Sequence, residues 1–343
     1  MVAMTVHSPL ITSLPPSRHE IMDFDLVTRA GKLTLVAAAL GYHVDVCTWD
    51  PVSDRWTDYK LDAPAFDNDH PDLAVIGAAV VDGRIVVGGG GDHHGFATWD
   101  LKTGKVRLEN DASLQGSTNS AVRADFGGRS VFVVGHQDGV DLVDPRMTES
   151  DEGGEDSDPE KPSPYGPLVD IEELECWSGA SSAAAAGLWT GRPAVVARGR
   201  HGGVLVWDIE EGRHLAKLCD LGETLTEFAL APVDGRMRVV AAGGQSLVLG
   251  DSDSNDWGAS FTVPGDEVSC LTAGTVHGRP LAVTGARDGT ICVWDLTERR
   301  LLGQPLRGHG SEVLGLRMAD LDSRPVIISS AHGDSVHLWE FLS

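Results

Sequence analysis

The side chains best suited to chemistry in this sequence are histidines that recur at a fixed distance before tryptophan. His43, His93 and His201 each lie six residues before a Trp. The run Asp92-His93-His94 also offers the imidazole and carboxylate ligands that a transition metal could use. In a second interpretation, each histidine replaces a hydrogen-bonding turn residue inside its own repeat. Zinc needs its nitrogen ligands about 2.0–2.1 Å from one centre, so the distance between these turns in the fold decides between the two.

Other catalytic patterns are missing from the sequence. It contains neither a Gly-x-Ser-x-Gly nucleophile elbow nor a Ser-x-x-Lys pair. The glycine run at 88–91 lacks the Gly-Lys-Ser/Thr ending of a phosphate-binding loop, which favours a turn at a strand end. Cys47 and Cys292 each lie two residues before a Trp, so we expect them to be buried packing residues. We therefore predict no catalytic residue and no cofactor.

The elements that must position these residues recur with a period of about 44 residues. Seven short apolar runs close on an acidic residue, most of them in a Trp-Asp pair, at Asp50, Asp100, Asp144, Asp208, Asp251, Asp295 and Glu340. Seven small-residue turns precede them, each followed by a cation that leads an apolar run, at Lys32, Arg84, Arg129, Arg192, Arg236, Arg279 and Arg324. Each period therefore predicts four short antiparallel strands, which is typical of a propeller blade.

One interval between closing acids, from Asp144 to Asp208, is about 20 residues longer than the others. The excess falls in 147–167, MTESDEGGEDSDPEKPSPYGP, which is rich in acidic residues and proline and has no apolar period. Such a segment cannot bury enough surface to offset its ordering entropy. We expect a disordered acidic insertion between the third and fourth repeats, within one domain spanning residues 1–343.

The repeats resemble the WD-repeat family of β-propellers. The best copies are GARDGTICVWDLTERRL at 285–301 and the final copy, which ends in VHLWE at 336–340. The resemblance implies an all-β fold: a single seven-bladed β-propeller of four-stranded antiparallel blades. The last repeat stops directly after its Trp strand, so we expect the segment TVHSPLITS at 5–13 to supply its outer strand and close the ring.

The resemblance also implies a buried structural tetrad, in which a Ser or Thr, a His and an Asp form hydrogen bonds around the blade Trp. The matching residues in blades six and seven are Thr284, Asp288, Trp294, His309, Ser329 and Trp339. Two departures are visible, because Asp266 stands where blade six should have its His, and Asp334 is displaced by one position.

The resemblance also bears on the histidines. Strands in a sheet are about 4.8 Å apart, so equivalent turns of neighbouring propeller blades would lie on the order of 10 Å apart. This separation favours the structural role of the histidines, and we predict no metal site.

Four carboxylates share one register position, directly before the first strand of a repeat: Glu20, Asp72, Glu267 and Glu312. The equivalent residues of the other repeats are Ser117, Ala180 and Thr224. In the resembled fold this position lies at the mouth of the central channel, and the four acidic blades are contiguous around the ring. We therefore expect an acidic crescent that binds a basic partner, or alternatively a hard cation through its oxygens.

The composition also bears on the partners and the cellular location of the protein. The chain has 51 Asp and Glu against 27 Lys and Arg, which argues against nucleic acid as a partner. It has neither a long apolar stretch nor a basic-then-apolar leader, so we expect no membrane span and no signal peptide. Five cysteines without a paired motif fit a reducing cytoplasm. Only 6 of the 27 cations are Lys, which hints at a GC-rich bacterial genome.

Together these observations predict a monomeric, non-catalytic scaffold for an unidentified protein partner. The alternative is a propeller enzyme, or a protein that binds a small molecule or a cation through the carboxylate-lined channel.

Overall fold

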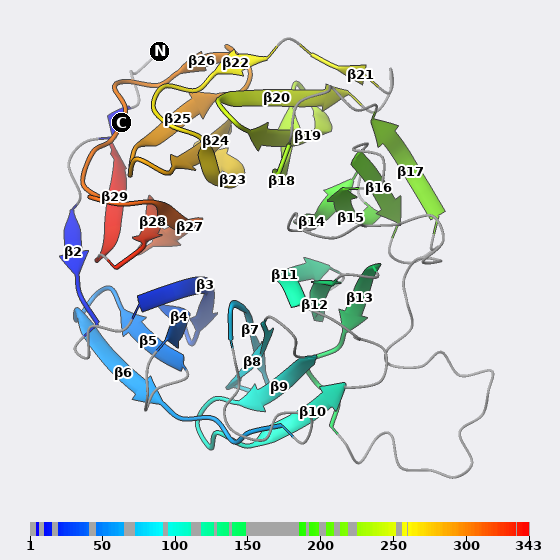
Figure 1. The fold of residues 1–343 in the computed structure, drawn as a ribbon, viewed down its shortest axis with the longest axis vertical. Helices are drawn as coiled ribbons and strands as arrows, with labels where there is room; N and C mark the ends of the chain where they lie inside the picture. Colours follow the sequence, from blue (N-terminus) through cyan, green and yellow to red (C-terminus); the bar gives the residue numbers. More distant parts are fainter. Residues whose placement is uncertain are drawn as a thin grey trace. The chain divides into compact units, whose positions relative to one another are not determined.

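The computed structural model (Figure 1) is all-β in the part of the chain it describes. It describes residues 5–6, 10–15, 20–40, 46–64, 73–91, 95–110, 118–126, 129–136, 139–148, 185–189, 192–198, 204–208, 213–218, 225–251, 256–258, 260–333 and 335–342. These residues form seven antiparallel sheets, one for each sequence repeat. The fold is a seven-bladed β-propeller, as the period predicted, and each sheet is one blade.

The chain divides into two compact units, which we describe separately. The second unit, Met22–Ala186 with Ile209–Arg213, holds most of blade one and all described strands of blades two and three. Blade one consists of β3 (Glu20–Arg29), β4 (Lys32–Leu40), β5 (Val46–Asp50) and β6 (Arg55–Tyr59). Blade two consists of β7 (Val75–Val81), β8 (Arg84–Gly90), β9 (Phe96–Asp100) and β10 (Val106–Asn110). Blade three has, in the described ranges, β11 (Thr118–Phe126), β12 (Arg129–His136) and β13 (Gly139–Val143).

The first unit comprises Met1–Ile21, Gly187–Asp208 and His214–Ser343. Blade four consists of β14 (Ala185–Trp189), β15 (Arg192–Arg198), β16 (Val204–Asp208) and β17 (Arg213–Leu218). Blade five consists of β18 (Glu227–Val233), β19 (Arg236–Gly243), β20 (Ser246–Asp251), β21 (Asp256–Trp257) and β22 (Phe261–Thr262). Blade six consists of β23 (Val268–Val276), β24 (Arg279–Ala286), β25 (Ile291–Asp295) and β26 (Arg300–Leu301). Blade seven consists of β27 (Val313–Leu321), β28 (Arg324–Ala331) and β29 (Val336–Leu342).

The N-terminal segment completes blade seven. Its strands β1 (Thr5–Val6) and β2 (Ile11–Ser13) both pair antiparallel with β29, the strand that holds the last Trp. Figure 1 shows β2, in blue, alongside β29, in red. The sequence prediction that 5–13 supplies the missing outer strand is confirmed, and the pairing covers an edge that would otherwise be open to association.

The turn before each cation-led strand has a backbone that only a few residue types tolerate. In blades two, five and six the two turn residues are Asp82-Gly83, Asp234-Gly235 and His277-Gly278, all with positive φ. Two consecutive positive φ angles are characteristic of the type I′ hairpin turn, whose twist matches the flanking strands. The turn therefore fixes the register in which the following Arg begins its strand.

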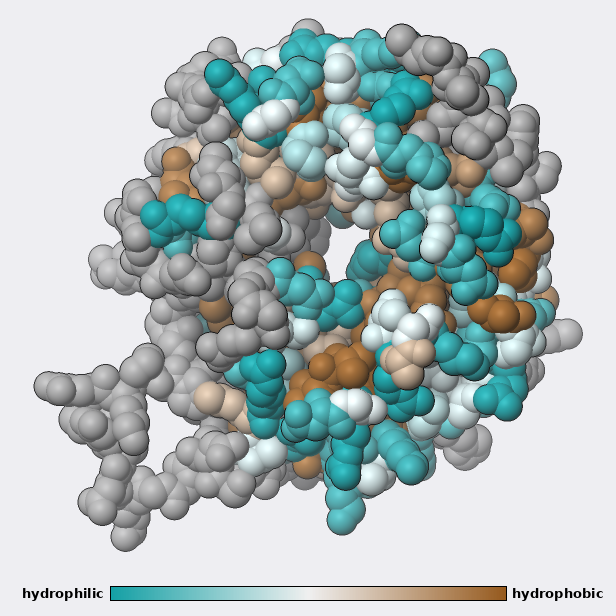
Figure 2. Space-filling view, turned by 180° about the vertical axis from the view of Figure 1, so that it is seen from behind, coloured by the Kyte–Doolittle hydropathy of each residue, from teal (hydrophilic) through white to brown (hydrophobic). Residues whose placement is uncertain are grey.

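The cores lie between neighbouring blades. Within the second unit, one buried hydrophobic cluster joins blades one and two and another joins blades two and three. Within the first unit, equivalent clusters join blades five and six and blades six and seven. On the face shown in Figure 2, hydrophilic and intermediate side chains, teal and white, cover much of the described surface, with hydrophobic ones, brown, between them.

Several predicted features fall outside the described residues. Of the acidic insertion at 147–167, only Met147 and Thr148 are described, and Asp72, Asp334 and the histidines at 43, 93, 94 and 201 are not. Among the residues that the structure does describe, no helix is long and apolar enough to cross a membrane.

Candidate functional site

The predicted carboxylates occupy equivalent places at the start of their blades. Glu20 is the first residue of β3, and Glu267 and Glu312 directly precede β23 and β27. We call these three residues, all of the first unit, the acidic arc. The fourth predicted member, Asp72, lies outside the described part of the chain. The side chains of Glu267 and Glu312 are 52% and 40% exposed, so both carboxylates are accessible to a ligand.

A guanidinium lies between two carboxylates of the acidic arc. Arg287 Nη1 is 2.6 Å from Glu267 Oε2, and Arg287 Nε is 3.7 Å from Glu312 Oε1. The Arg287 backbone N–H also donates to the Glu267 carbonyl at 2.9 Å, which fixes the base of the side chain beside its partner. Arg287 is itself 58% exposed, so these ion pairs are open to solvent and to competition by another cation.

The third carboxylate has a partner of its own. The His332 imidazole forms an ion pair with Glu20 when protonated, and its backbone N–H donates to the Glu312 carbonyl at 2.9 Å. His332 and Arg287 are equivalent residues, because each follows the last residue of its blade's second strand. In both cases the side chain reaches a carboxylate at the start of the next blade in the chain's cyclic order.

These two basic side chains revise the prediction from sequence. The register indicated an acidic crescent, and no role was predicted there for Arg287 or His332. The described arc is a set of three carboxylates interleaved with one guanidinium and one imidazole. The signal that could have revealed the pairing is the common spacing, because Glu267 and Glu312 are separated by the same 45 positions as Arg287 and His332.

A depression of about 600 Å³ adjoins the acidic arc. Glu267 and Arg287 form one side of it, and the turn between β19 and β20 forms the other, with Gly243, Gly244 and Gln245. The Gln245 side-chain amide donates to the Gly265 carbonyl at 2.6 Å, which holds this turn against the segment before β23. The depression thus offers an exposed carboxylate and backbone groups to a side chain entering from solvent.

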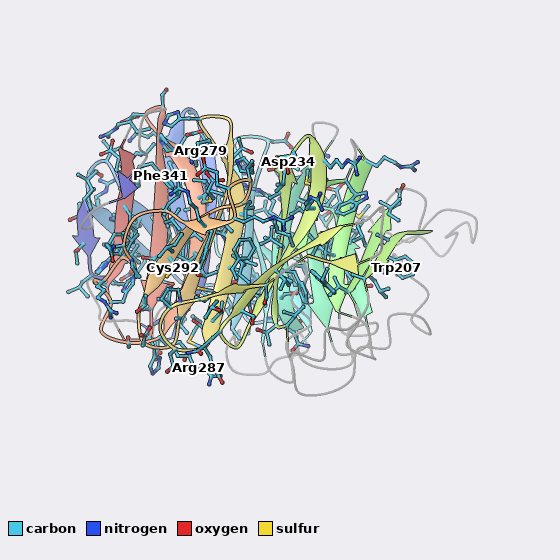
Figure 3. The ribbon with its side chains drawn as sticks, turned by 90° about the horizontal axis from the view of Figure 1, so that it is seen from above. Trp207, Asp234, Arg279, Arg287, Cys292 and Phe341 are labelled. Carbon is cyan, nitrogen blue, oxygen red and sulfur yellow. The ribbon has the colours of Figure 1, made fainter. Side chains whose placement is uncertain are left out.

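The arc and the cation-led turns lie at opposite edges of the sheets. Figure 3 labels Arg287 at one edge and Arg279 and Asp234 at the other, all within the first unit. Arg279 begins β24 and Arg287 follows its end, so the length of that strand separates them. The two edges therefore present different surfaces, the acidic arc on one and the hairpin turns with their cations on the other.

Five of the six predicted tetrad residues are buried in blades six and seven, and Asp288 is exposed. Trp294 Nε1 donates to Thr284 Oγ1 at 3.1 Å in blade six. In blade seven, Trp339 Nε1 donates to Ser329 Oγ at 2.9 Å, and His309 Nε2 is 2.7 Å from the same oxygen.

The Asp expected in the tetrad of blade six closes its own turn, and the one expected in blade seven, Asp334, lies outside the described residues. Asp288 accepts the backbone N–H of Thr290, which closes its own turn. In blade seven, the His337 ring stacks on His309 with their centroids 4.1 Å apart, and its Nε2 is 2.7 Å from Ser335 Oγ. His337, which the sequence analysis did not single out, thus extends the buried network.

Blades one and two satisfy their Trp N–H in another way, because the position ten residues before the Trp is Ala39 in one and Gly89 in the other. Trp49 Nε1 donates to the Asp54 carboxylate at 2.9 Å, and Trp99 Nε1 donates to the Asp62 carbonyl at 2.9 Å. A buried indole N–H usually finds a partner, so the tetrad is one of several local solutions in this chain.

No described group of three His, Cys, Asp or Glu side chains is arranged to hold a metal ion. The cysteines that the structure describes, Cys47, Cys270 and Cys292, are buried free thiols. Burial raises the pKa of Cys47 and of Cys292 to about 12, and it raises that of Cys270 as well. These thiols are protonated at neutral pH, so they have the character of packing residues and not of nucleophiles.

No family model and no curated protein matches the sequence. Among solved structures, the chain is similar to one described as "Crystal structure of the computationally designed Ika8 protein". The match has a TM-score of 0.57 and 20% sequence identity, and it covers 97% of this chain and 99% of the other. At this identity the likeness bears on the fold alone.

Proposed function

We propose that the protein is a non-catalytic binding module of the WD-repeat type, and that its acidic arc receives an Arg or Lys side chain of a partner protein. The observation that carries the proposal is the position of Arg287 between Glu267 and Glu312. Two exposed carboxylates that already hold one guanidinium have the spacing to hold another. We further propose a monomer in a bacterial cytoplasm, in keeping with the composition.

In this proposal Arg287 acts as an internal competitor. A partner's guanidinium would replace it at the carboxylates, and the released Arg287 would turn to solvent, where it is already more than half exposed. The exchange replaces one exposed ion pair by another, so it contributes specificity and association rate more than raw affinity. Most of the affinity must then come from the partner's other contacts with the blade edges.

The test is the binding of fluorescent peptides that carry one central Arg, measured by anisotropy at several salt concentrations. Glu267→Gln with Glu312→Gln should weaken binding about three- to tenfold, since it removes both exposed ion pairs with the peptide's Arg. Arg287→Gln should strengthen binding by about two- to fivefold, the range of an exposed ion pair. Asp320→Asn is the matched control, because Asp320 is an exposed acid of the same unit, near the end of β27.

The opposite signs of the two variants make the test decisive. If the double Gln variant binds as tightly as the wild type with the same salt slope, the arc is not the site. If Arg287→Gln weakens binding, then Arg287 contacts the partner instead of competing with it. A peptide whose central Arg is replaced by citrulline should bind like the double variant.

A further inference from the structure

A second depression lies in the other unit, between blades one and two, at the edge where the cation-led strands begin. Its volume is about 400 Å³, within the range of pockets that bind small molecules. Five cations line this depression. Blade one contributes Arg29, Lys32 and Arg55, and blade two contributes Arg84 and Lys102. One carboxylate, that of Asp50, faces them. In a chain with almost twice as many acids as bases, this concentration of cations in one pocket is unexpected.

Comparison with blade six shows that the pocket takes the place of part of the hydrophobic core between two blades. Blades one and six can be aligned on the turn cation, the closing acid and the first residue of the outer strand. At four of the aligned positions, blade six has buried hydrophobic residues of the core between blades six and seven: Val276, Leu281, Val293 and Leu302. The same four positions in blade one all line the pocket: Arg29, Thr34, Thr48 and Thr57. Blade one thus has one cation and three hydroxyls where blade six has four buried hydrophobic side chains.

Arg29 is the clearest departure from the repeat. The residue three positions before the turn cation is Val81, Phe126, Trp189, Val233, Val276 and Leu321 in the other six blades. Val81, Val233 and Val276 are each buried in the core that joins their blade to the next. Giving up that buried area costs stability, and Arg29 is instead exposed at the pocket. The loss is understandable if the pocket has a ligand.

The charges of the pocket are only partly balanced by the protein. Lys32 Nζ is 3.6 Å from Asp50 Oδ2, and Arg84 Nη1 is 3.4 Å from Asp100 Oδ2. Within the described ranges, Arg29, Arg55 and Lys102 make no ion pair. The Asp50 carboxylate also accepts hydrogen bonds from the Ser53 hydroxyl and from backbone N–H groups of its turn, so it has little capacity for further cations.

We propose that this pocket binds a small phosphorylated metabolite that carries hydroxyl groups. A guanidinium group can bind two phosphate oxygens at once, and a lysine ammonium group adds a point charge beside it. The Thr34, Thr48 and Tyr59 hydroxyls, farther from the sheet edge, would form hydrogen bonds with the hydroxyls of the organic part. The site lies outside the acidic arc, and the inference does not depend on the proposed function.

The test is isothermal calorimetry and thermal melting of the full chain with inorganic pyrophosphate, a hexose phosphate and the unphosphorylated hexose, all at constant ionic strength. The two phosphates should raise Tm in proportion to their excess over Kd, and the hexose should not. Arg29→Val restores the residue type of the other blades, so it should fold normally and weaken phosphate binding at least about tenfold. Arg55→Gln should weaken it similarly, and Arg300→Gln, its equivalent in blade six, should not.

Several results would overturn the proposal. One is the absence of heat and of any Tm change with all phosphates at millimolar concentration. Another is equal stabilisation by sulfate and by phosphate, which would show general screening of the cations and not a built site. A third is unchanged phosphate affinity in both Arg29→Val and Arg55→Gln, which would place the bound phosphate elsewhere on the protein.

Discussion

The guanidinium of Arg279 forms an ion pair and a hydrogen bond with the buried carboxylate of Asp295. Arg279 begins β24 and Asp295 ends β25, so the contact ties together the two central strands of blade six at one edge. Each residue belongs to a different periodic signal in the sequence, the turn cation and the closing acid of the Trp-Asp pair. The two signals keep the same period because their members bind each other.

The same contact recurs in four other blades. Lys32 pairs with Asp50, Arg84 with Asp100, Arg192 with Asp208 and Arg324 with Glu340. In each of these four pairs the cation is more exposed than the acid, so the acid also depends on local hydrogen bonds for its charge. Asp295 accepts the backbone N–H groups of Thr297 and Glu298 in addition to Arg279. The closing acid is therefore a structural residue that caps the turn after its strand.

We expect Asp295→Ala to destabilise the fold by about 2 kcal/mol, because it removes the acceptor of two turn N–H groups and the buried partner of Arg279. Chemical denaturation followed by tryptophan fluorescence measures the change. Asp320→Asn, an exposed acid of the same unit, should stay within about 0.5 kcal/mol of wild type. Equal effects of the two substitutions would show that the turn does not depend on the Asp295 carboxylate.

The closing acids also predict how stability depends on acidity. Burial alone would raise the pKa of Asp50, Asp100 and Asp295, but hydrogen bonds from their turns and the paired cations outweigh it and lower each pKa below the usual 3.8. A carboxyl whose pKa is lower in the folded state stabilises the fold at pH values above its pKa in the unfolded chain. That stabilisation is lost as the pH falls through its pKa in the folded state. Tm should therefore be flat from pH 7 to about 4.5 and fall below pH 4, less steeply in Asp295→Ala.

We expect Trp294→Ala to be far more damaging than Trp56→Ala. Trp294 is 3% exposed and donates to Thr284, whereas Trp56 is partly exposed and stacks on Trp49 with their centroids 5.9 Å apart. Truncating a buried aromatic costs about 3–5 kcal/mol, and truncating an outer stacking partner costs about 1 kcal/mol. Urea midpoints compare the two variants directly, and similar midpoints would contradict the assigned burial.

The fold was predictable because its information is local and repeated. Each blade carries the same turn, cation and Trp-Asp pattern, and seven copies in register identify the propeller even where single copies are degenerate. Gly250 shows why a degenerate copy still folds. It stands where blade five should have its Trp, and the Trp257 ring from the outer strand lies against it, 3.1 Å from where a Cβ would be.

The candidate site was only partly predictable. The register alone identified Glu267 and Glu312, because equivalent positions of repeats lie at equivalent places. The role of Arg287 depends on which way a long side chain points at the end of a strand, and the sequence does not contain that direction. The pocket at Arg29 was missed for a different reason. The departure from the repeat was visible, but its meaning required knowing that the position faces the next blade.

The buried thiols give a prediction about reactivity. The raised pKa values of Cys47, Cys270 and Cys292 keep these residues as thiols at neutral pH. We expect none of the three to be alkylated by iodoacetamide at pH 8 in the native state, and all three to react in urea, as peptide mass spectrometry would show. A raised folded-state pKa also means that stability falls as pH rises above about 9, where the unfolded chain releases these protons.

The last prediction concerns Arg123 of β11, which connects the inner strands of three blades within the second unit. Its Nη1 donates to the Leu26 carbonyl of blade one at 2.8 Å and to the Ala78 carbonyl of blade two at 3.0 Å. Arg123→Met keeps the length and the apolar stem but removes both donors, and it should cost about 1–3 kcal/mol. Asp125→Asn removes only the exposed acid that pairs with Arg123 Nε at 3.1 Å, and it should cost less than about 1 kcal/mol. Denaturant unfolding separates the two mechanisms, because equal losses would mean that the ion pair, and not the bridge between strands, is the stabilising contact.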